Sequence, residues 1–201
     1  MKSFSNGGEF VDIGAKAYAD YLNGDNEGLV IIVKTYSDSL VNFICKFVRD
    51  RQTAEDLMQD TFVEPISKKN KFRNESQFKT YLFRIARNKA VDFIRKSSKT
   101  TFIFDETTVG DEDKLCVEDD ICNAETKADL HAAIKTLNPA YREVIYLSYF
   151  NNLSNEEIAI IIKKSKRQTE LLLYRAKQSL KSALEKEGFI YGFNVQPWSP
   201  W

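Results

Sequence analysis

Several residue types that mark common protein classes are scarce in this sequence. It has three cysteines (Cys45, Cys116 and Cys122) and one histidine, and their spacing is not that of metal ligands. We therefore expect reduced thiols and neither a metal nor another cofactor. No run of about 18 apolar residues suggests a membrane span, and the start MKSFSNGGEF lacks the apolar core of a signal peptide. These absences predict a cytoplasmic protein.

Charge is unevenly distributed along the 201 residues, although 29 basic and 29 acidic side chains cancel. Residues 68–99 carry eleven Lys or Arg against two acids, and residues 163–186 carry eight against two. Between these basic blocks, residues 105–120 hold eight acids and one lysine. Clustered basic residues are the electrostatic mark of a nucleic-acid-binding surface, so the overall neutrality does not exclude that class.

Hydrophobic periodicity predicts an all-α protein. The apolar residues Leu40, Phe43 and Ile44 follow the three-and-four spacing of an amphipathic helix, and no β-rich segment is present. Thr53 is the expected N-cap of the next helix, which Pro65 should end or kink. A long helix is then expected from about residue 75 to residue 96.

A change in composition after residue 97 divides the chain into two helical parts. The acid-rich segment that follows has no helical pattern, and periodicity resumes near Ala124, so this segment is interpreted as a flexible linker. The predicted fold is two small helical domains joined by an acidic linker. The predicted ranges are an N-terminal extension at 1–14, a first domain at 15–98, the linker at 99–124, a second domain at 125–188 and a C-terminal tail at 189–201.

The second domain has the pattern of a helix-turn-helix. Ser154 with Glu157, and Ser165 with Gln168, form two capping boxes around a tight turn at residues 163–164. In such a unit the second helix enters the major groove of DNA. The side chains expected on its exposed side are Lys166, Arg167, Glu170, Tyr174 and Lys177. The alternative is a helical bundle whose basic face is only solvated.

The segment FKTYLFRIARNKAVDFIRK at residues 78–96 interleaves six cations with four aromatic residues. A basic helix face can follow a phosphate backbone, and neighbouring aromatic side chains can stack on unpaired bases, each worth about 1–3 kcal/mol. The pattern is therefore typical of single-strand binding. Periodicity alone equally allows a helix whose aromatics are all core and whose arginines are only solubilising.

Asp56, Asp60 and Glu64 form an acidic stripe on the helix before it. Paired carboxylates can bind Mg²⁺ or act as acid and base, but neither a nearby histidine nor a glycine-rich phosphate loop accompanies them. A metal-dependent nucleic-acid enzyme is therefore disfavoured. A protein-docking surface or a solvated face fits the stripe better, and we predict no catalytic residue.

Two segments resemble the RNA polymerase sigma factors of the sigma-70 family, in particular the extracytoplasmic-function (ECF, group IV) branch. AEDLMQDTFVEPISKKNKFRNESQFKTYLFRIARNKAVDFIRK, at residues 54–96, resembles region 2 of these proteins. LNPAYREVIYLSYFNNLSNEEIAIIIKKSKRQTELLLYRAKQSLKSAL, at residues 137–184, is similar to region 4. The resemblance implies a factor, not itself an enzyme, that directs core polymerase to promoters. It would recognise the minus-35 duplex and capture the melted minus-10 strand.

The resemblance also implies a role for each surface. The acidic helix would dock on the clamp helices of the largest polymerase subunit through Asp56, Gln59, Asp60 and Phe62. The melted minus-10 strand, with one base flipped into a pocket, would be held by Phe72, Asn74, Ser76, Phe78, Arg84, Arg87, Asn88 and Arg95. The minus-35 duplex would be contacted by Lys164, Lys166, Arg167, Gln168, Glu170, Tyr174 and Lys177.

The implied partners are core RNA polymerase, promoter DNA and, as for many members of this branch, an anti-sigma protein. The sequence departs from the family pattern at Pro65 and at Glu170, Leu171 and Leu172, near the start of the recognition helix. The alternative function is a stand-alone helix-turn-helix regulator that binds duplex DNA without polymerase. That alternative leaves the acidic helix and the basic–aromatic helix unexplained.

Overall fold

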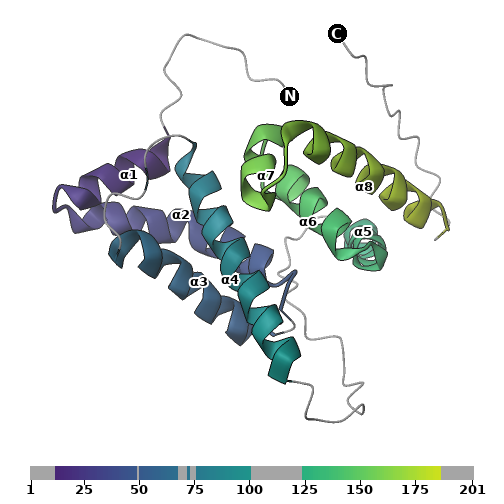
Figure 1. Cartoon of the computed structure of the whole chain (residues 1–201), viewed down its shortest axis with the longest axis horizontal. Coiled ribbons are helices and arrows are strands. Elements are labelled where there is room, and N and C mark those ends of the chain that lie inside the picture. Colours follow the sequence, from purple (N-terminus) through teal and green to yellow (C-terminus); the bar gives the residue numbers. More distant parts are fainter. Residues whose placement is uncertain (1–11, 49, 68–71, 73–75, 101–123, 187–201) are drawn as a thin grey trace, which may run out of the picture.

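The computed structural model describes residues 12–48, 50–67, 72, 76–100 and 124–186. Every regular element within these ranges is a helix (Figure 1), so the predicted all-α class is confirmed. Most of the N-terminal extension, most of the predicted linker, the C-terminal tail, Asn74, Cys116 and Cys122 lie outside the described residues. None of the helices in the described ranges combines the length and the apolar character that a bilayer span requires.

The first helical part consists of α1 (Ile13–Leu22), α2 (Asn26–Ile44), α3 (Arg51–Ser67) and α4 (Phe78–Thr100). Helix α2 packs against the other three. A Cβ atom at Gly28 would lie 2.2 Å from the carbonyl oxygen of Ala17, so glycine permits the close approach of α2 to α1. The predicted stripe of Leu40, Phe43 and Ile44 is buried in the core of this part.

The ends of α3 differ from the prediction. The Thr53 backbone N–H donates to Oδ1 of Asp50 at 2.7 Å, and the helix already begins at Arg51. Asp50 is therefore the cap, and the prediction of Thr53 is wrong. At the other end, α3 continues past Pro65 to Ser67. Pro65 is buried, and its carbonyl oxygen accepts a hydrogen bond from the Tyr18 hydroxyl at 2.9 Å.

Asp12 caps two helices at once. Its Oδ1 accepts a hydrogen bond from the Ala15 backbone N–H at 3.1 Å, and its Oδ2 accepts one from the Phe78 N–H at 2.6 Å. The N-terminus of α4 is therefore fixed by a carboxylate 66 positions earlier in the chain. Directly after α2, Cys45 is disulfide-bonded, so the expectation of reduced thiols is wrong for this residue.

The second helical part consists of α5 (Ala124–Thr136), α6 (Pro139–Ile145), the π-helical turn η2 (Tyr146–Phe150), α7 (Asn155–Ile162) and α8 (Lys166–Lys186). Both predicted capping boxes are confirmed, the first by reciprocal hydrogen bonds between Ser154 and Glu157 and the second by those between Ser165 and Gln168. Lys163 adopts a left-handed conformation with φ of 57° between the two helices. This tight turn makes α7 and α8 the predicted helix-turn-helix.

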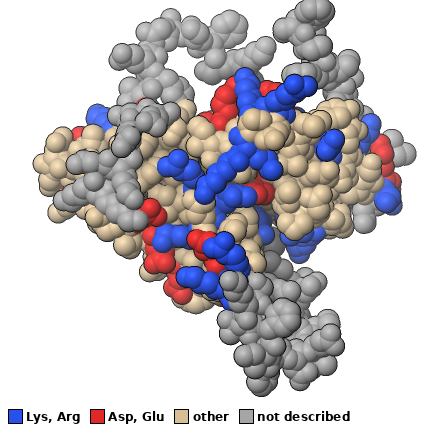
Figure 2. Space-filling model, viewed as in Figure 1, with Lys and Arg blue, Asp and Glu red and all other residues tan. Residues whose placement is uncertain are grey.

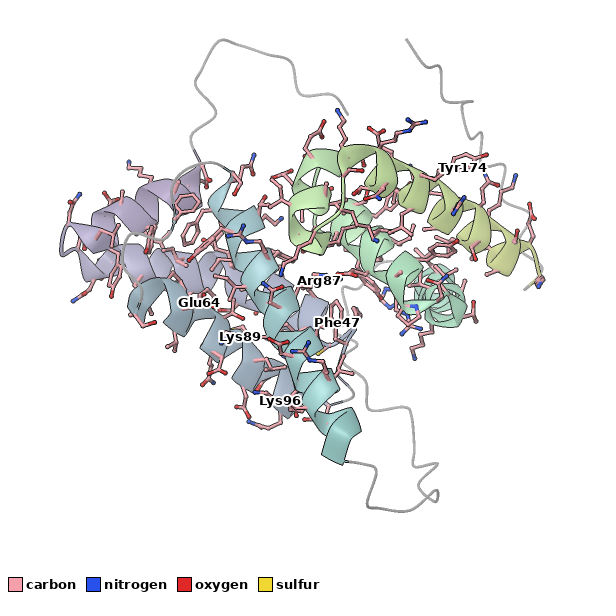
Figure 3. The ribbon with its side chains drawn as sticks, viewed as in Figure 1. Phe47, Glu64, Arg87, Lys89, Lys96 and Tyr174 are labelled. Atoms are coloured by element: carbon pink, nitrogen blue, oxygen red, sulfur yellow. The ribbon has the colours of Figure 1, made fainter. Side chains whose placement is uncertain are left out.

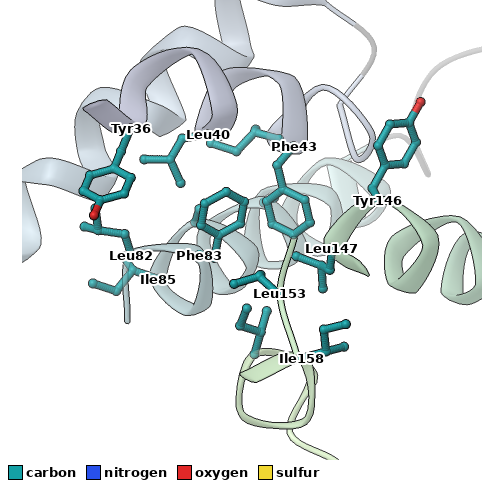
Figure 4. Close-up of a cluster of buried hydrophobic side chains, with 14 of the residues drawn as sticks. Tyr36, Leu40, Phe43, Leu82, Phe83, Ile85, Tyr146, Leu147, Leu153 and Ile158 are labelled. Carbon is teal, nitrogen blue, oxygen red and sulfur yellow. The ribbon is translucent and has the colours of Figure 1, made fainter. Parts of the chain in front are cut away.

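The two helical parts share one apolar core. Leu147 and Leu153 of the second part point toward Phe43 and Phe83 of the first (Figure 4), and Ile158 lies beside them. Helix α4 packs directly on α7. This packing places part of α4 against the helix-turn-helix unit.

Candidate nucleic-acid and protein interfaces

The outward face of α3 is acidic with an apolar residue beside the acids. Asp56, Gln59 and Asp60 are exposed, as predicted for a docking surface. The Asp60 side chain is 65% exposed, and its Oδ2 lies 3.8 Å from Nζ of Lys89. Val63 is 55% exposed on the same helix and lies three positions beyond Asp60. A polar rim beside an apolar side chain is the composition of a protein-binding surface.

Phe62 does not belong to this outward face. It is 6% exposed and packs in the core of the first part. In the structure Phe62 lies on the buried face of α3, together with Ala54 and Thr61. Sequence reasoning missed Val63, although its spacing of seven residues from Asp56 indicates the same helix face.

An aromatic cluster surrounds the start of α4. The ring centroid of Phe78 lies 5.1 Å from that of Tyr18 and 5.1 Å from that of Phe72, and the Phe72 ring lies 5.4 Å from that of Tyr81. Phe78 is fully buried, whereas Phe72 and Ser76 are half-buried. Phe78 therefore supports the cluster from within, and Phe72 is the predicted aromatic that reaches the surface.

Tyr81 belongs to the same cluster and was not predicted as a site residue. Its buried hydroxyl has no hydrogen-bond partner among the described residues. Burial raises the pKa of this hydroxyl, so it stays protonated and able to donate. The guanidinium carbon of Arg84 lies 5.7 Å from the Tyr81 ring centroid, a cation–π arrangement.

The basic side chains of α4 divide between two environments. Arg84 and Arg95 are exposed, and Nη2 of Arg95 lies 2.9 Å from Oδ1 of Asp92. Arg87 and Asn88 are half-buried, and Arg87 forms an ion pair with Glu143 of the second part. Figure 2 shows the Lys and Arg side chains as a band over α4, between the two helical parts, and Figure 3 marks Arg87 at this boundary.

Lys79, the second residue of α4, also faces the second part. Its Nζ donates a hydrogen bond to the backbone oxygen of Asn151 at 2.7 Å. Burial lowers the pKa of Lys79, and the neighbouring carboxylate of Glu157 opposes that shift. Lys79 was not among the predicted site residues.

The start of α8 is the second basic surface. Lys164, Lys166, Arg167 and Gln168 are exposed at its N-terminal end, with Tyr174 and Lys177 further along and Glu170 half-buried. Lys166 pairs with Glu156, and this contact raises the pKa of Lys166. Gln168 is engaged through Oε1, which accepts from the Ser165 N–H at 3.0 Å. Because Oε1 is engaged in the cap, the side chain of Gln168 can contact a base only as a donor, through its NH2 group.

Two further side chains extend this surface. Leu171 is 49% exposed and Tyr174 is 55% exposed, and both follow Arg167 at helical spacing. Nζ of Lys177 lies 5.3 Å from the ring centroid of Tyr149. The surface therefore combines cations with apolar and aromatic side chains that can contact base edges.

Comparison with known proteins identifies both halves of the chain. Residues 32–100 match the family model of sigma-70 region 2, and residues 127–180 match that of sigma-70 region 4. The ECF RNA polymerase sigma factor SigM of Bacillus subtilis is 30% identical over 151 residues, which cover 75% of this chain and 91% of SigM. RNA polymerase sigma factor SigV of the same organism is 28% identical over 79% of this chain and 92% of SigV.

Solved structures show the same fold. The sigma factor RpoE from Bartonella quintana, in complex with the anti-sigma factor NepR, matches with a TM-score of 0.68 at 22% identity. The match covers 80% of this chain and 98% of that protein. CnrH, in complex with the cytosolic domain of CnrY, matches with a TM-score of 0.60 at 21% identity, over 87% of this chain and 96% of CnrH.

Proposed function

This chain belongs to the ECF branch of the sigma-70 family of RNA polymerase sigma factors, and we propose that three separate surfaces share its task in promoter recognition. As a sigma factor it directs core RNA polymerase to promoters and acts in the initiation of transcription. The supporting observation is that one chain carries an exposed acidic helix face, a basic–aromatic helix and a basic helix-turn-helix. A stand-alone duplex-binding regulator would need only the last of these.

We assign the first helical part to region 2 and the second to region 4. The acidic segment between α4, which ends at Thr100, and α5, which begins at Ala124, links them, so the proposed boundaries differ by one or two residues from the predicted 15–98, 99–124 and 125–188. The family matches at 32–100 and 127–180 support this division. We infer that the chain acts in the cytoplasm, as a transcription initiation factor and not as an enzyme. An anti-sigma protein is a further proposed partner, because the matching RpoE structure holds the anti-sigma factor NepR.

The outward face of α3 is the proposed docking site for core polymerase. Asp56, Gln59 and Asp60 supply polar and negative groups, and Val63 supplies the apolar contact that excludes water at the centre of an interface. Phe62 acts indirectly, because it anchors this face to the core from below.

The start and the basic face of α4 form the proposed site for the melted minus-10 strand. Phe72 offers a ring to an unpaired base, and Ser76 and Asn88 offer hydrogen bonds from half-buried positions. Asn74 belongs to the same proposed site. Arg84, Arg87 and Arg95 neutralise phosphates. Phe78 holds the cluster in place.

The start of α8 is the proposed site for the minus-35 duplex. Arg167 is placed to donate to guanine, whereas Lys164, Lys166 and Lys177 are suited to phosphates. Glu170, Gln168 and Tyr174 lie on or beside the same face. Leu171 lies one turn beyond Arg167, where its exposed side chain can contact a thymine methyl group.

The decisive test is co-elution of the purified chain with bacterial core RNA polymerase on a sizing column. We expect a one-to-one complex, and we expect Asp60→Lys to weaken it by about tenfold or more, since the variant reverses charge in the docking face. Asp38→Lys is the matched control, because Asp38 is an exposed acid on α2. Equal affinities for the Asp60 and Asp38 variants would contradict docking through α3, and a folded chain that never co-elutes would contradict the sigma-factor function.

A further inference from the structure

Three cations meet where the end of α2 reaches the second helical part. Lys46 follows α2, Lys135 lies in the last turn of α5, and Arg142 lies in α6. Nζ of Lys46 lies 4.4 Å from the ring centroid of Tyr146. Tyr146 follows Arg142 by one helical turn, and its backbone N–H donates to the Arg142 carbonyl oxygen. Within the described ranges, no carboxylate pairs with any of the three cations. A group of cations without acidic partners attracts anions.

Arg142 is held in place through one of its nitrogens and keeps other donors in reserve. Its Nη2 donates to the backbone oxygen of Lys135 at 2.6 Å and to that of Leu137 at 3.1 Å. These bonds fix the guanidinium beside the end of α5. Its Nε is buried and has no hydrogen-bond partner among the described residues. Because an unpaired buried donor costs free energy, an acceptor supplied by a ligand at this point would be stabilising.

The three cations are close enough to repel one another. Burial, followed by the charges of Lys135 and Arg142, lowers the pKa of Lys46 to about 8. Lys46 therefore still carries its proton in most molecules at neutral pH. A negatively charged ligand would offset both the repulsion and the cost of burying this charge.

Aromatic side chains continue the same surface beyond the cations. The ring centroid of Phe150 lies 4.6 Å from that of Tyr146 and 5.8 Å from that of His131. His131 lies one turn before Lys135 on α5, just as Tyr146 lies one turn after Arg142. Phe150 is 44% exposed, whereas Tyr146 is buried. An accessible ring therefore lies at one end of the surface and the cations lie at the other.

We propose that the three cations and Phe150 form a binding site for a nucleoside polyphosphate. The cations neutralise the phosphates, and the base stacks on the exposed ring of Phe150. Three positive charges exceed the charge of about −2 on a single phosphate group, so a diphosphate or triphosphate fits the site better than a monophosphate. None of these four residues belongs to the surfaces assigned to polymerase or DNA, and the inference does not depend on the proposed function.

The test is isothermal titration calorimetry of the full-length chain with ATP and, separately, with GTP. Inorganic tripolyphosphate and adenosine serve as probes for the two halves of the ligand. We expect saturable one-to-one binding of at least one nucleotide, weaker binding of tripolyphosphate and no measurable binding of adenosine. If neither nucleotide binds saturably to the folded chain, the proposal is wrong.

Lys135→Glu tests the cationic end of the site. Lys135 is exposed, so the substitution should leave the fold intact, which circular dichroism checks. We expect the affinity for the nucleotide and for tripolyphosphate to fall by about tenfold, because a phosphate contact is replaced by repulsion. Lys34→Glu is the matched control, since Lys34 is an exposed lysine of α2 outside the site. Equal losses for the two variants would show general attraction to positive charge and would overturn the site.

Phe150→Ala tests the aromatic end. We expect the affinity for the nucleotide to fall by about fivefold or more, since base stacking is lost, and the affinity for tripolyphosphate to stay unchanged. Tyr149→Ala is the matched control, because Tyr149 is 54% exposed in the same π-helical turn and its ring lies beside Lys177 instead. An equal loss of nucleotide affinity in both variants, or an equal loss for tripolyphosphate in Phe150→Ala, would contradict stacking on Phe150.

Discussion

Helices α4 and α8 are both long, amphipathic and rich in cations, but they lie in opposite surroundings. On α4, the side chain of Arg87 is 21% exposed and is paired with a buried glutamate. On α8, Arg167 lies on an open face near the helix start. Both helices carry cations of the kind that bind phosphates, and packing decides which of these cations are exposed to solvent.

The ion pairs of the two helices also differ in their exposure to water, because the second helical part covers one pair and not the other. Arg87 and Glu143 lie within the contact between regions 2 and 4, so removal of one partner leaves the other charge poorly solvated. Lys166 and Glu156 form a pair whose side chains are 59% and 57% exposed, and water can replace either partner. The first pair restrains the arrangement of the two regions, whereas the second adds little to it.

The largest expected effect comes from charge reversal in each helix. Arg87→Glu removes a phosphate contact and places a carboxylate beside Glu143, so we expect the polymerase complex to lose about tenfold or more in affinity for the single-stranded minus-10 oligonucleotide. Arg167→Glu should instead weaken binding of the minus-35 duplex by a similar factor. Anisotropy titrations with the two DNA ligands measure both losses.

The free chains of these two variants should also differ in size. Repulsion between Glu143 and the new carboxylate should separate regions 2 and 4 and increase the Stokes radius for Arg87→Glu, whereas Arg167→Glu should elute like the wild type. If both variants weakened both DNA ligands equally, the distinction between the two helices would be wrong.

A moderate effect is expected from pH, through Lys46. Its Nζ lies 4.4 Å from the ring centroid of Tyr146. Burial, together with the charges of Lys135 and Arg142, lowers the pKa of Lys46 to about 8 from 10.5. The unfolded chain binds this proton more tightly than the folded chain between those values, so stability should rise with pH in that window. From pH 7.5 to 9 the gain is about 1 kcal/mol.

Urea unfolding of the wild type and of Lys46→Met at the two pH values isolates this contribution. The gain should be smaller by about 1 kcal/mol in Lys46→Met. Lys166→Met, on the open face of α8, should retain the wild-type gain, because its contact with Glu156 raises the pKa of Lys166 and moves its titration above this window. An identical pH response in all three proteins would show that Lys46 is solvated in solution.

The smallest expected effect concerns Leu171 on the open helix. Leu171→Ala should reduce the affinity for a minus-35 site that places thymine opposite it by about threefold, since an apolar contact with a methyl group is lost. Replacement of that thymine by deoxyuridine, which lacks the methyl group, should lower the affinity of the wild type for the duplex by the same factor. The affinity of Leu171→Ala should not change on this replacement. If deoxyuridine lowered the affinity of Leu171→Ala as much as that of the wild type, Leu171 would not contact the methyl group.

The sequence predicted the local structure of region 4 well because its signals are local. Both capping boxes join residues three positions apart, and Asn138 caps the helix that begins at Pro139 in the same way. Prediction was weaker in region 2. Thr53 has the side chain of a cap, but Asp50 accepts the hydrogen bond from the Thr53 N–H, and nothing in the pattern distinguishes the two.

The exposure of the proposed site residues was predicted only in part. Phe62 and Phe78 match family positions with a functional role, yet both are buried, because an aromatic side chain gains more from the core than from solvent exposure. Val63 was missed because an exposed valine has no distinctive sequence signal. Gln168 was assigned to DNA, although the capping box already engaged it.

The sequence by itself determined the helices, the helix-turn-helix caps and the family, since these depend on side-chain spacing within a few turns. Only the tertiary structure decided that Asp12 caps α4 from 66 positions away, and that Glu143 pairs with Arg87 from 56 positions away. The physical reason is that apolar packing brings distant carboxylates beside particular donors. Spacing along the chain contains no information about which donors those are, so it cannot tell the covered cations of α4 from the open ones of α8.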